Sequence, residues 1–212
     1  MELMERAGRT LLPEQAEQFE RYLALLLEAN QKMNLTRIDD LAAARVQHIG
    51  DALTLLPWLP EKGRIADVGS GGGVPGLVLA ISRPDMSFTL IEATLKKAEF
   101  LGRAARELGL PNVAILPQRA EGVAREGRRF HVVTARAVAP LDRLLEWCLP
   151  LLRPDGVLLA MKGARAQEEI RAARPALAGR FAARASVHPV KLPGLDHHQI
   201  VVIGGKNDRA VR

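Results

Sequence analysis

The stretch Ile65-Ala66-Asp67-Val68-Gly69-Ser70-Gly71-Gly72-Gly73-Val74-Pro75-Gly76 decides the class of fold. An apolar segment ends at an acid, passes through a run of glycines and continues into a segment of helical composition. Glycines at such a place let the backbone turn tightly and let a ligand approach without a Cβ in the way. The helix beyond presents unpaired N–H groups at its first turn. The stretch therefore predicts a strand, a ligand-binding turn and a helix, in that order.

Two ligand patterns fit the same glycines, and the stretch by itself leaves both open. Gly71-x-Gly73-x-x-Gly76 matches the dinucleotide fingerprint. Asp67-x-Gly69-x-Gly71-x-Gly73 matches the first motif of S-adenosylmethionine-dependent methyltransferases, and it places Asp67 where a carboxylate can meet the methionine ammonium. A turn without a ligand is the weaker interpretation, because adjacent glycines lose backbone entropy on folding without a gain in packing.

The segments after the third strand and before the fifth favour the second pattern, whereas Glu92 fits both. Glu92 ends the next predicted strand, where a carboxylate can accept both ribose hydroxyls of a nucleoside in either pattern. Arg119-Ala120-Glu121 follows the third strand, where a methyltransferase holds the adenine. The segment 151–159 resembles the leucine, proline and glycine turn before the fifth strand of many methyltransferases.

Strand and helix signals alternate from residue 64 onward, which predicts a parallel sheet with right-handed crossovers. The predicted strands are Arg64–Val68, Ser87–Ile91, Val113–Leu116, Phe130–Thr134 and Gly156–Met161. The predicted helices between and after them are Gly76–Ser82, Leu95–Leu108, Ala120–Arg125, Ala139–Leu152 and Ala166–Ala178.

The C-terminal part breaks this alternation. Two strand signals, Ser186–Leu192 and Gln199–Ile203, are joined by Pro193-Gly194-Leu195-Asp196 with no helix between them. They predict a hairpin, so the last strand should run antiparallel to its neighbours. A mainly parallel sheet that ends in such a hairpin is less usual in nicotinamide-dependent dehydrogenases.

Helical signals precede the sheet. Pro13 followed by Glu14 suits a first helical turn. Residues 1–60 are predicted to form a helical addition and residues 61–212 the methyltransferase-like core, together one compact structural unit. The predicted N-terminal helices cover residues 12–29, 39–46 and 48–56.

Composition narrows the class of protein. The chain has 212 residues, 48% of them hydrophobic and 25% charged, which excludes an intrinsically disordered protein and suits one sizeable core. The longest uncharged stretch has 15 residues, whereas a membrane-spanning helix needs about 20 apolar residues. The first residues carry no secretion signal. We therefore expect a cytoplasmic protein that does not associate with a membrane.

The charge and the cysteine and histidine content bear on partners. The net charge of +6 predicts a surface that attracts polyanions, but charge alone leaves nucleic-acid binding open. Cys148 is the only cysteine, which excludes a disulfide framework, and its apolar neighbours indicate a core residue. His197 and His198 lack further ligands at zinc spacing, so we expect no metal site.

Several short motifs occur together in one order along the chain. They are Asn34-Leu35-Thr36-Arg37, His48-Ile49-Gly50-Asp51, the Asp67–Gly76 stretch, Lys96-Lys97 with Phe100-Leu101, Arg119-Ala120-Glu121, Thr134-Ala135-Arg136-Ala137, Lys162-Gly163 and Val201-Val202-Ile203. In these motifs nearly the whole chain resembles the RsmG family, the 16S ribosomal RNA guanine-N7 methyltransferases once called glucose-inhibited division protein B. Such an ordered set is far more specific than one glycine motif.

The resemblance implies methyl transfer from S-adenosylmethionine to N7 of guanine 527 (standard numbering) in 16S ribosomal RNA, with S-adenosylhomocysteine as the product. It implies a class I, Rossmann-like α/β fold, with a mostly parallel seven-stranded sheet and an antiparallel C-terminal hairpin. The partner would be 16S ribosomal RNA or the 30S subunit, and we expect a monomer. The cofactor pocket would be lined by Asp67, Gly69, Gly71, Gly73, Val74, Glu92, Ala120, Glu121 and Arg136.

The chain departs from the family pattern at two places. The family often has Leu at the position of Gly50, so a helix packing position is loosened here. It often has Arg in the stretch that is His197-His198-Gln199 in this chain. The second departure leaves open how the C-terminal hairpin contacts RNA.

The chemistry of guanine N7 limits what the active site needs. N7 carries an in-plane lone pair and no proton, so we expect positioning rather than a general base. Arg136 and Lys162 end the fourth and fifth predicted strands at the ligand-binding edge. Arg136 can hold the cofactor carboxylate or O6 of guanine, and Lys162 can contact phosphate or base. A structural ion pair is the alternative for each.

Basic residues supply the candidate RNA contacts, with a solvated or packed position as the alternative for each. Because only 4% of the residues are aromatic, we expect recognition by charge and shape more than by stacking. The candidates are Asn34, Arg37, His48, Lys96, Lys97, Arg119 and Lys162.

Other functions remain open on the residues alone. The chain could methylate a small molecule or another RNA. It could be a nicotinamide-dependent oxidoreductase that uses Gly71-x-Gly73-x-x-Gly76, although the hairpin argues against this. A non-catalytic RNA-binding module is disfavoured by the intact glycine-rich turn.

Overall fold

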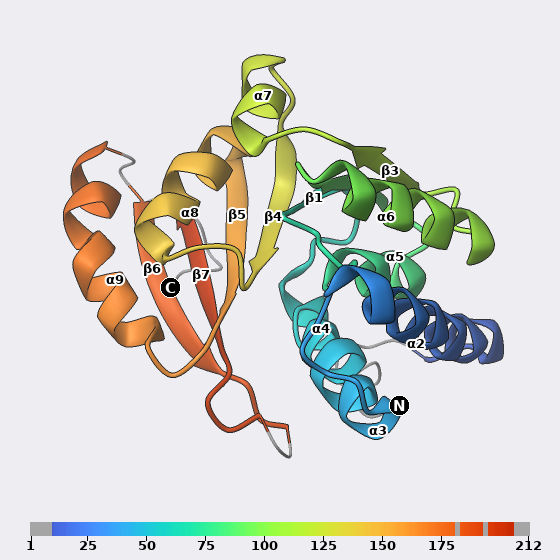
Figure 1. The fold of residues 1–212 in the computed structure, drawn as a ribbon. Helices are drawn as coiled ribbons and strands as arrows, with labels where there is room; N and C mark the ends of the chain where they lie inside the picture. The colour runs from blue at the N-terminus through green and yellow to red at the C-terminus, as the bar shows by residue number, and fades with distance from the viewer. Residues whose placement is uncertain (1–9, 181–182, 193–194, 206–212) are drawn as a thin grey trace.

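The computed structural model describes residues 10–180, 183–192 and 195–205. Within them, one seven-stranded sheet has the order β3-β2-β1-β4-β5-β7-β6 (Figure 1). Strands β1 to β5 pair in parallel, and β7 runs antiparallel to both β5 and β6, which confirms the predicted fold class. The strands are β1 (Arg64–Val68), β2 (Ser87–Ile91), β3 (Val113–Leu116), β4 (Phe130–Arg136), β5 (Leu152–Lys162), β6 (Ala183–Pro189) and β7 (Gln199–Gly205).

Helices accompany each part of the sheet. No helix in the described ranges is both long enough and apolar enough to cross a membrane. The helices are α2 (Pro13–Met33), α3 (Leu41–Ala44), α4 (Asp51–Leu53), α5 (Gly76–Ser82), α6 (Leu95–Glu107), α7 (Ala120–Arg125), α8 (Leu141–Cys148) and α9 (Ala166–Pro175), with the shorter or wider helical turns η1 (Arg45–Gly50), η2 (Leu56–Trp58), η3 (Leu149–Leu151) and η4 (Ala176–Arg180).

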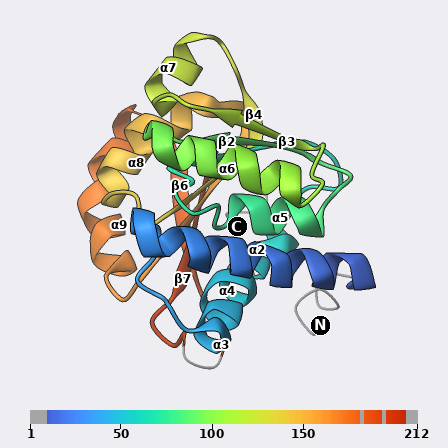
Figure 2. The same cartoon turned by 45° about the vertical axis from the view of Figure 1, so that its right-hand side comes forward.

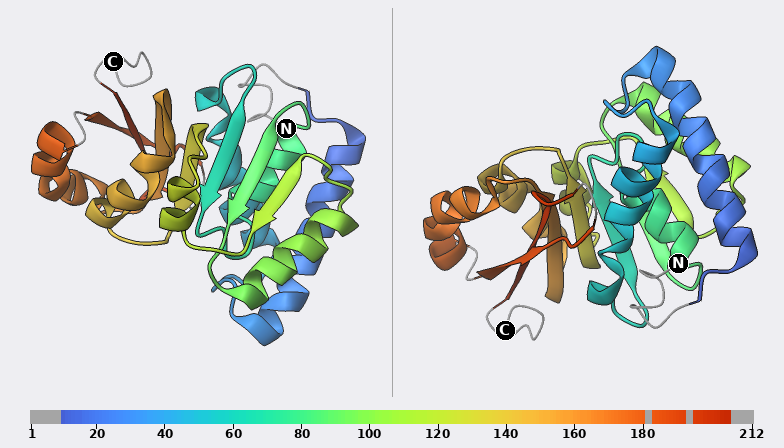
Figure 3. Two further views of the ribbon diagram at one scale, coloured as in Figure 1. Left: turned by 90° about the horizontal axis from the view of Figure 1, so that it is seen from above. Right: turned by 90° about the horizontal axis from the view of Figure 1, so that it is seen from below.

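Both faces of the sheet are covered, because its central strands are apolar on both sides. Ile65 of β1 belongs to a hydrophobic cluster with α2, α5 and α6, whereas its neighbour Ala66 belongs to a second cluster with α7, α8 and α9. The views from above and below show helices on the two sides of the strands (Figure 3). The buried Cys148 lies in the second cluster, as predicted for a core residue.

Helix α2 attaches the N-terminal helices to the core. Its Tyr22, Leu23 and Leu26 are buried in the same cluster as α5 and α6, and Figure 2 shows α2 beside these helices. The Tyr22 hydroxyl donates to the carbonyl oxygen of Gly72 at 2.8 Å. This helix therefore supports the glycine-rich turn directly. The division of the chain near residue 60 stays a prediction.

The second and third predicted helices form one helical run in the structure. Residues 41–53 continue through α3, η1 and α4, because Gln47, which separates the two predicted helices, lies within η1. The prediction of two separate helices was wrong at this point. A π-helical stretch such as η1 is often found at functional sites, and η1 contains His48.

The C-terminal strands begin earlier than predicted. β5 begins at Leu152 instead of Gly156, because Leu152 already pairs with β4. β6 covers Ala183–Pro189 instead of residues 186–192, because its partner β7 continues to Gly205. Neighbouring strands therefore set the ends of strands whose existence the apolar pattern predicts.

Candidate functional site

The carboxyl ends of β1, β2 and β4 meet at the point where the sheet reverses its strand order. β1 lies between β2 and β4, and α5 and α7 pack on opposite faces. Such a switch point is where open α/β sheets bind ligands. Two cavities lie at this edge.

The glycine-rich turn between β1 and α5 needs glycine for two different reasons. Gly69 has a φ of +68°, and a Cβ there would come within 2.7 Å of Val138 Cγ2. Gly71 has a φ of +53°, and a Cβ there would have no atom closer than the Gly69 carbonyl oxygen at 3.8 Å. The turn is thus packed against Val138 at one position and leaves open space for a ligand at the other.

Asp67 lies beneath the turn and holds it in place. It is buried, one carboxylate oxygen accepts from the Thr134 hydroxyl at 2.8 Å, and the other accepts from the backbone N–H of Gly76 at 3.3 Å. Burial raises the pKa of Asp67 to about 6, against the opposing effect of these hydrogen bonds. Asp67 does not line either cavity, so its contact with a methionine ammonium stays a prediction.

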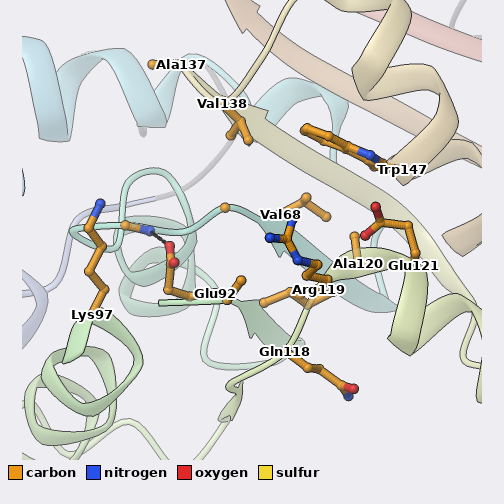
Figure 4. A pocket seen from close by; sticks show the side chains of 14 residues that line it. Val68, Glu92, Lys97, Gln118, Arg119, Ala120, Glu121, Ala137, Val138 and Trp147 are labelled. Carbon is orange, nitrogen blue, oxygen red and sulfur yellow. Dashed lines mark hydrogen bonds between the residues drawn. The ribbon is translucent and has the colours of Figure 1, made fainter. Parts of the chain in front are cut away.

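Glu92 braces the turn from the end of β2. One oxygen accepts from the backbone N–H of Gly71 at 2.9 Å, and the other accepts from the N–H of Thr94 at 2.7 Å. Its side chain lines the cavity with the Gly71 bond drawn in Figure 4. The carboxylate is therefore fixed beside the turn, and its contact with a ribose stays a prediction.

The smaller cavity, of about 320 Å³, lies between the glycine-rich turn, the end of β2, the start of α7 and α8. Gly73 and Val74 do not line it, and Val74 is buried. Trp147 and Val138 form one wall (Figure 4). The predicted cofactor residues that do line it are Gly69, Gly71, Glu92, Ala120 and Glu121.

Trp147 and Val138 line the smaller cavity, but neither was predicted as a site residue. Trp147 lies among apolar residues of the amphipathic α8, where an aromatic side chain is typical of a core position. Val138 follows Ala137, whose φ of +54° turns the chain after β4. Neither feature has a signal in a single sequence that separates a cavity wall from ordinary packing.

The larger cavity, of about 790 Å³, adjoins the smaller one, and both include Ala137 and Val138 in their walls. Its other walls come from the loop after α2, from η1, from the ends of β4 and β5, and from the start of β7. Basic side chains dominate its polar lining. They are Arg37, His48, Arg136, Lys162, Arg165 and His198.

Arg136 joins this cavity to the N-terminal helices. Its Nη1 donates to the Gln47 carbonyl oxygen at 2.7 Å and lies 3.5 Å from Asp51 Oδ2, and its Nη2 donates to His48 Nδ1 at 3.0 Å. His198 Nδ1 shares Asp51 Oδ2 at 3.1 Å. Burial raises the pKa of Asp51, while the His198 and Arg136 charges oppose this. Arg136 lines only the larger cavity, so its contact with cofactor stays a prediction.

Lys162 is held by protein groups. Its Nζ donates to the Ala139 carbonyl oxygen at 2.6 Å and to Glu169 Oε2 at 2.8 Å. The same carboxylate oxygen accepts from the N–H of Leu141 at 2.8 Å. Lys162 therefore fastens the loop that separates the two cavities.

The remaining candidate RNA residues do not gather at one place. Lys97 and Arg119 line the smaller cavity. Lys96 lies with Lys32 and other residues in a groove between α2 and α6. Asn34 is exposed at the C-terminal end of α2, with a φ of +50°. The structure thus brings only Arg37, His48 and Lys162 together with Arg136.

Most of the chain is similar in sequence to one family of known proteins. A family model described as GidB, rRNA small subunit methyltransferase G, matches residues 15–198. The chain belongs to this family. A relative with the family's name from Sorangium cellulosum is 50% identical over 154 residues, which are 70% of this chain and 64% of that protein. One from Chloroflexus aggregans is 42% identical over 200 residues, 92% of this chain and 84% of that protein.

The match thus covers slightly less than two thirds of the Sorangium GidB relative. Solved structures outside the GidB family share the fold at low identity. The O-methyltransferase TomG from Streptomyces achromogenes, solved in complex with SAM, has a TM-score of 0.60 at 19% identity, over 87% of this chain and 89% of that one. The ribosomal protein L11 methylase from Lactobacillus delbrueckii has a TM-score of 0.59 at 16% identity, over 76% and 79%. These identities show the methyltransferase fold alone.

The two departures from the GidB family pattern lie beside the larger cavity. A Cβ on Gly50 would lie 3.4 Å from Leu192 Cδ1, in ordinary contact, so a larger side chain there would pack toward the C-terminal hairpin. His198 and Gln199 line the cavity, and His197 is exposed. The hairpin therefore forms part of this cavity through His198 and Gln199.

Proposed function

We propose that this chain transfers a methyl group from S-adenosylmethionine to N7 of a guanine in 16S ribosomal RNA, and that the guanine is nucleotide 527 in standard numbering. The observation that carries the proposal is the pair of cavities with a common wall at Ala137 and Val138. One has an acid and a glycine-rich turn suited to a nucleoside. The other has a basic lining suited to a polyanion.

Glu92 in the smaller cavity supports this proposal, because its carboxylate can accept the ribose hydroxyls of S-adenosylmethionine. Each oxygen of Glu92 accepts one backbone N–H, and each keeps a second lone pair for a ribose hydroxyl. The open space at Gly71 leaves room for the ligand beside the turn. When bound, S-adenosylmethionine supplies a methyl group attached to a positively charged sulfur.

The work of the chain in this reaction is positioning. Guanine N7 presents a lone pair and no proton, so no side chain has to remove one. The residues of the larger cavity hold the base so that N7 lies in line with the methyl group, and such orientation lowers the barrier substantially. Arg136 and Lys162 keep their side chains fixed through protein partners, so they act as positioning residues that shape this cavity.

The target guanine has to be accessible at its major-groove edge, which carries N7. In an A-form helix this groove is deep and narrow, so the target lies in a loop or leaves its stack. Arg37 and Arg165 are exposed at the larger cavity, and they have no ion-pair partner within the described part of the chain. They are available for phosphate oxygens, which would make affinity for RNA depend on salt.

The test is methyl transfer to isolated 30S subunits from a strain that lacks this protein. We expect label from methyl-labelled S-adenosylmethionine to enter 16S ribosomal RNA with the wild-type protein. Gly71→Val should abolish transfer and the calorimetric binding of S-adenosylhomocysteine, because the valine fills the open space and is strained at a φ of +53°. Gly102→Ala, on α6 outside both cavities, is the matched control.

Three results would favour another function. Calorimetric preference for a nicotinamide dinucleotide over S-adenosylhomocysteine would favour an oxidoreductase. Label only in a small molecule or in another RNA would favour a different methyltransferase substrate. RNA binding that is unaffected by Gly71→Val and accompanied by no transfer would favour a non-catalytic binding module.

A further inference from the structure

Thr36 lines the larger cavity, and its hydroxyl group has one hydrogen-bonding capacity left. Thr36 lies in the loop after α2 and lines this cavity. Its backbone N–H donates to Asn30 Oδ1 at 2.8 Å, which fixes the loop at this residue. Its Oγ1 lies 3.1 Å from His48 Nε2 and 3.1 Å from the backbone nitrogen of Ile38.

The direction of the bond between His48 and Thr36 follows from Arg136. A guanidinium group can only donate, so His48 Nδ1 accepts from Arg136 Nη2 and carries no proton. Burial, helped by the Arg136 charge, lowers the pKa of His48 to about 4. The ring is therefore neutral near pH 7, and its one proton is on Nε2. That proton is donated to Thr36 Oγ1.

The Thr36 hydroxyl group has a proton left to donate and no lone pair left to accept. A hydroxyl oxygen has two lone pairs and one proton. The lone pairs of Thr36 Oγ1 accept from His48 Nε2 and from the Ile38 N–H. No acceptor for its proton is present among the described residues at hydrogen-bond distance. A part-buried hydroxyl that can donate but no longer accept is a group that selects its ligand.

We propose that Thr36 donates this hydrogen bond to O6 of the guanine that receives the methyl group, and that it is a specificity-determining residue. The assignment rests on the proposed function. N7 has to keep its lone pair free for the methyl group, and O6 is the acceptor beside N7 on the same edge of guanine. Adenine carries an amino group at that position, which would place two donors against each other.

Arg136 and His48 act through Thr36 in this arrangement. They are positioning residues, because they occupy the lone pair that would otherwise let the hydroxyl accept. The chain of donors runs from Arg136 through His48 to Thr36 and ends at the substrate. This gives a role to the hydrogen bond between the arginine at the end of β4 and the histidine in η1.

The test uses 30S subunits reconstituted with 16S ribosomal RNA that carries either guanine or 2-aminopurine at the target position. 2-Aminopurine keeps N7 but lacks O6. Dissociation constants for both particles are measured with wild-type protein, Thr36→Val and Thr36→Ser. Methyl transfer to the guanine particle and the dissociation constant of S-adenosylhomocysteine are measured for the same proteins. Thr89→Val, in β2 outside both cavities, controls for the same chemical change.

We expect Thr36→Val to weaken binding of the guanine particle by about tenfold, as for one lost hydrogen bond in a cavity. Thr36→Ser should restore most of the loss, and cofactor affinity should stay within about twofold of wild type. With 2-aminopurine, wild-type and Thr36→Val proteins should bind within about twofold of each other, because the acceptor is already absent.

Two outcomes would overturn the assignment. Thr36→Val could bind and methylate the guanine particle as well as wild type does. Alternatively, the losses from Thr36→Val and from 2-aminopurine could simply multiply, which would make Thr36 a structural residue or a contact to phosphate. Absence of transfer by the wild-type protein to the guanine particle would instead contradict the proposed function, and the assignment would fall with it.

Discussion

At the scale of single residues, one guanidinium group joins the sheet to the N-terminal helices. Arg136 reaches from the end of β4 to the Gln47 carbonyl, to His48 and to Asp51. The sequence motifs identified Arg136 and His48 as separate candidates, one for cofactor and one for RNA. Their contact depends on how η1 packs against the sheet edge, which no local pattern in the sequence encodes.

The titration of His48 should make stability depend on pH. The pKa of His48 falls from 6.5 to about 4 on folding, mainly through burial. Between these values the unfolded state binds more protons, so the histidine destabilises the folded state as pH falls. Between pH 7 and pH 4 this histidine should lower the free energy of unfolding of the wild-type protein by on the order of 3 kcal/mol. We expect His48→Gln to lack this decrease. Urea unfolding of both proteins at several pH values measures it.

Asp67 supplies a control of opposite sign. Its pKa rises from 3.8 to about 6 on folding, so the folded state binds more protons and loses stability as pH rises through this range. The free energy of unfolding of the wild-type protein should therefore fall as pH rises toward 7, and Asp67→Asn should lack this decrease. A difference between wild type and His48→Gln that is the same at every pH would contradict the neutral, buried histidine.

Trp147 should report on the smaller cavity. It lines this cavity, whereas the only other tryptophan, Trp58, packs against His188 with ring centroids 4.4 Å apart. We expect S-adenosylhomocysteine to change the fluorescence of a Trp58→Phe protein at the same concentrations that calorimetry gives for binding. A signal that persists in Trp147→Phe and disappears in Trp58→Phe would place the ligand elsewhere.

At the scale of elements, the glycine-rich turn is held between α2 and α5. Tyr22 of α2 bonds the Gly72 carbonyl, and Asp67 bonds the first N–H of α5. The N-terminal helices therefore contact the turn beside the smaller cavity without lining that cavity. Apolar periodicity predicted α2, but the role of its tyrosine depends on a contact across 50 residues.

Tyr22→Phe tests this support. The change removes the hydrogen bond and leaves the Gly72 carbonyl without its partner inside the protein. We expect the free energy of unfolding to fall by about 1–2 kcal/mol. The dissociation constant of S-adenosylhomocysteine should rise roughly threefold, as measured by calorimetry. Unchanged cofactor affinity would mean that the turn keeps its shape without α2.

Substitution by alanine should change the free energy of unfolding in opposite directions at two helical glycines. A Cβ on Gly76 would lie 2.8 Å from Asp67 Oδ2 and 3.0 Å from Leu90 Cγ, whereas a Cβ on Gly102 has no neighbour nearer than 3.5 Å. We expect Gly76→Ala to destabilise the protein by about 2–3 kcal/mol. Gly102→Ala should stabilise it by about 0.5–1 kcal/mol. Urea unfolding measures the free energy of unfolding of both variants. Equal changes in the two variants would contradict the close packing around Gly76 in α5.

The boundaries of elements could be predicted where a local signal sets them. α5 and α7 occur at their predicted residues, because glycine or an acid marks each start. β5 and β6 could not be placed as well, since pairing with β4 and β7 extends them. The helical run at residues 41–53 was predicted as two helices separated at Gln47, which lies inside η1 in the structure.

At the scale of the whole molecule, the sheet order places two cavities side by side at one edge. Motif order predicted the fold, and the predicted cofactor residues that line the smaller cavity are Gly69, Gly71, Glu92, Ala120 and Glu121. It did not predict the larger cavity, because that cavity is formed by segments between 35 and 200 that meet only in the folded chain.

We propose that this chain methylates one guanine at N7. The most direct measurement maps the modified nucleotides of 16S ribosomal RNA from a strain with this protein, from a deletion strain and from the deletion strain supplied with Gly71→Val. We expect N7-methylguanine at position 527 in the first strain and unmodified guanine there in the other two. The same methyl group at that position in the deletion strain would contradict it.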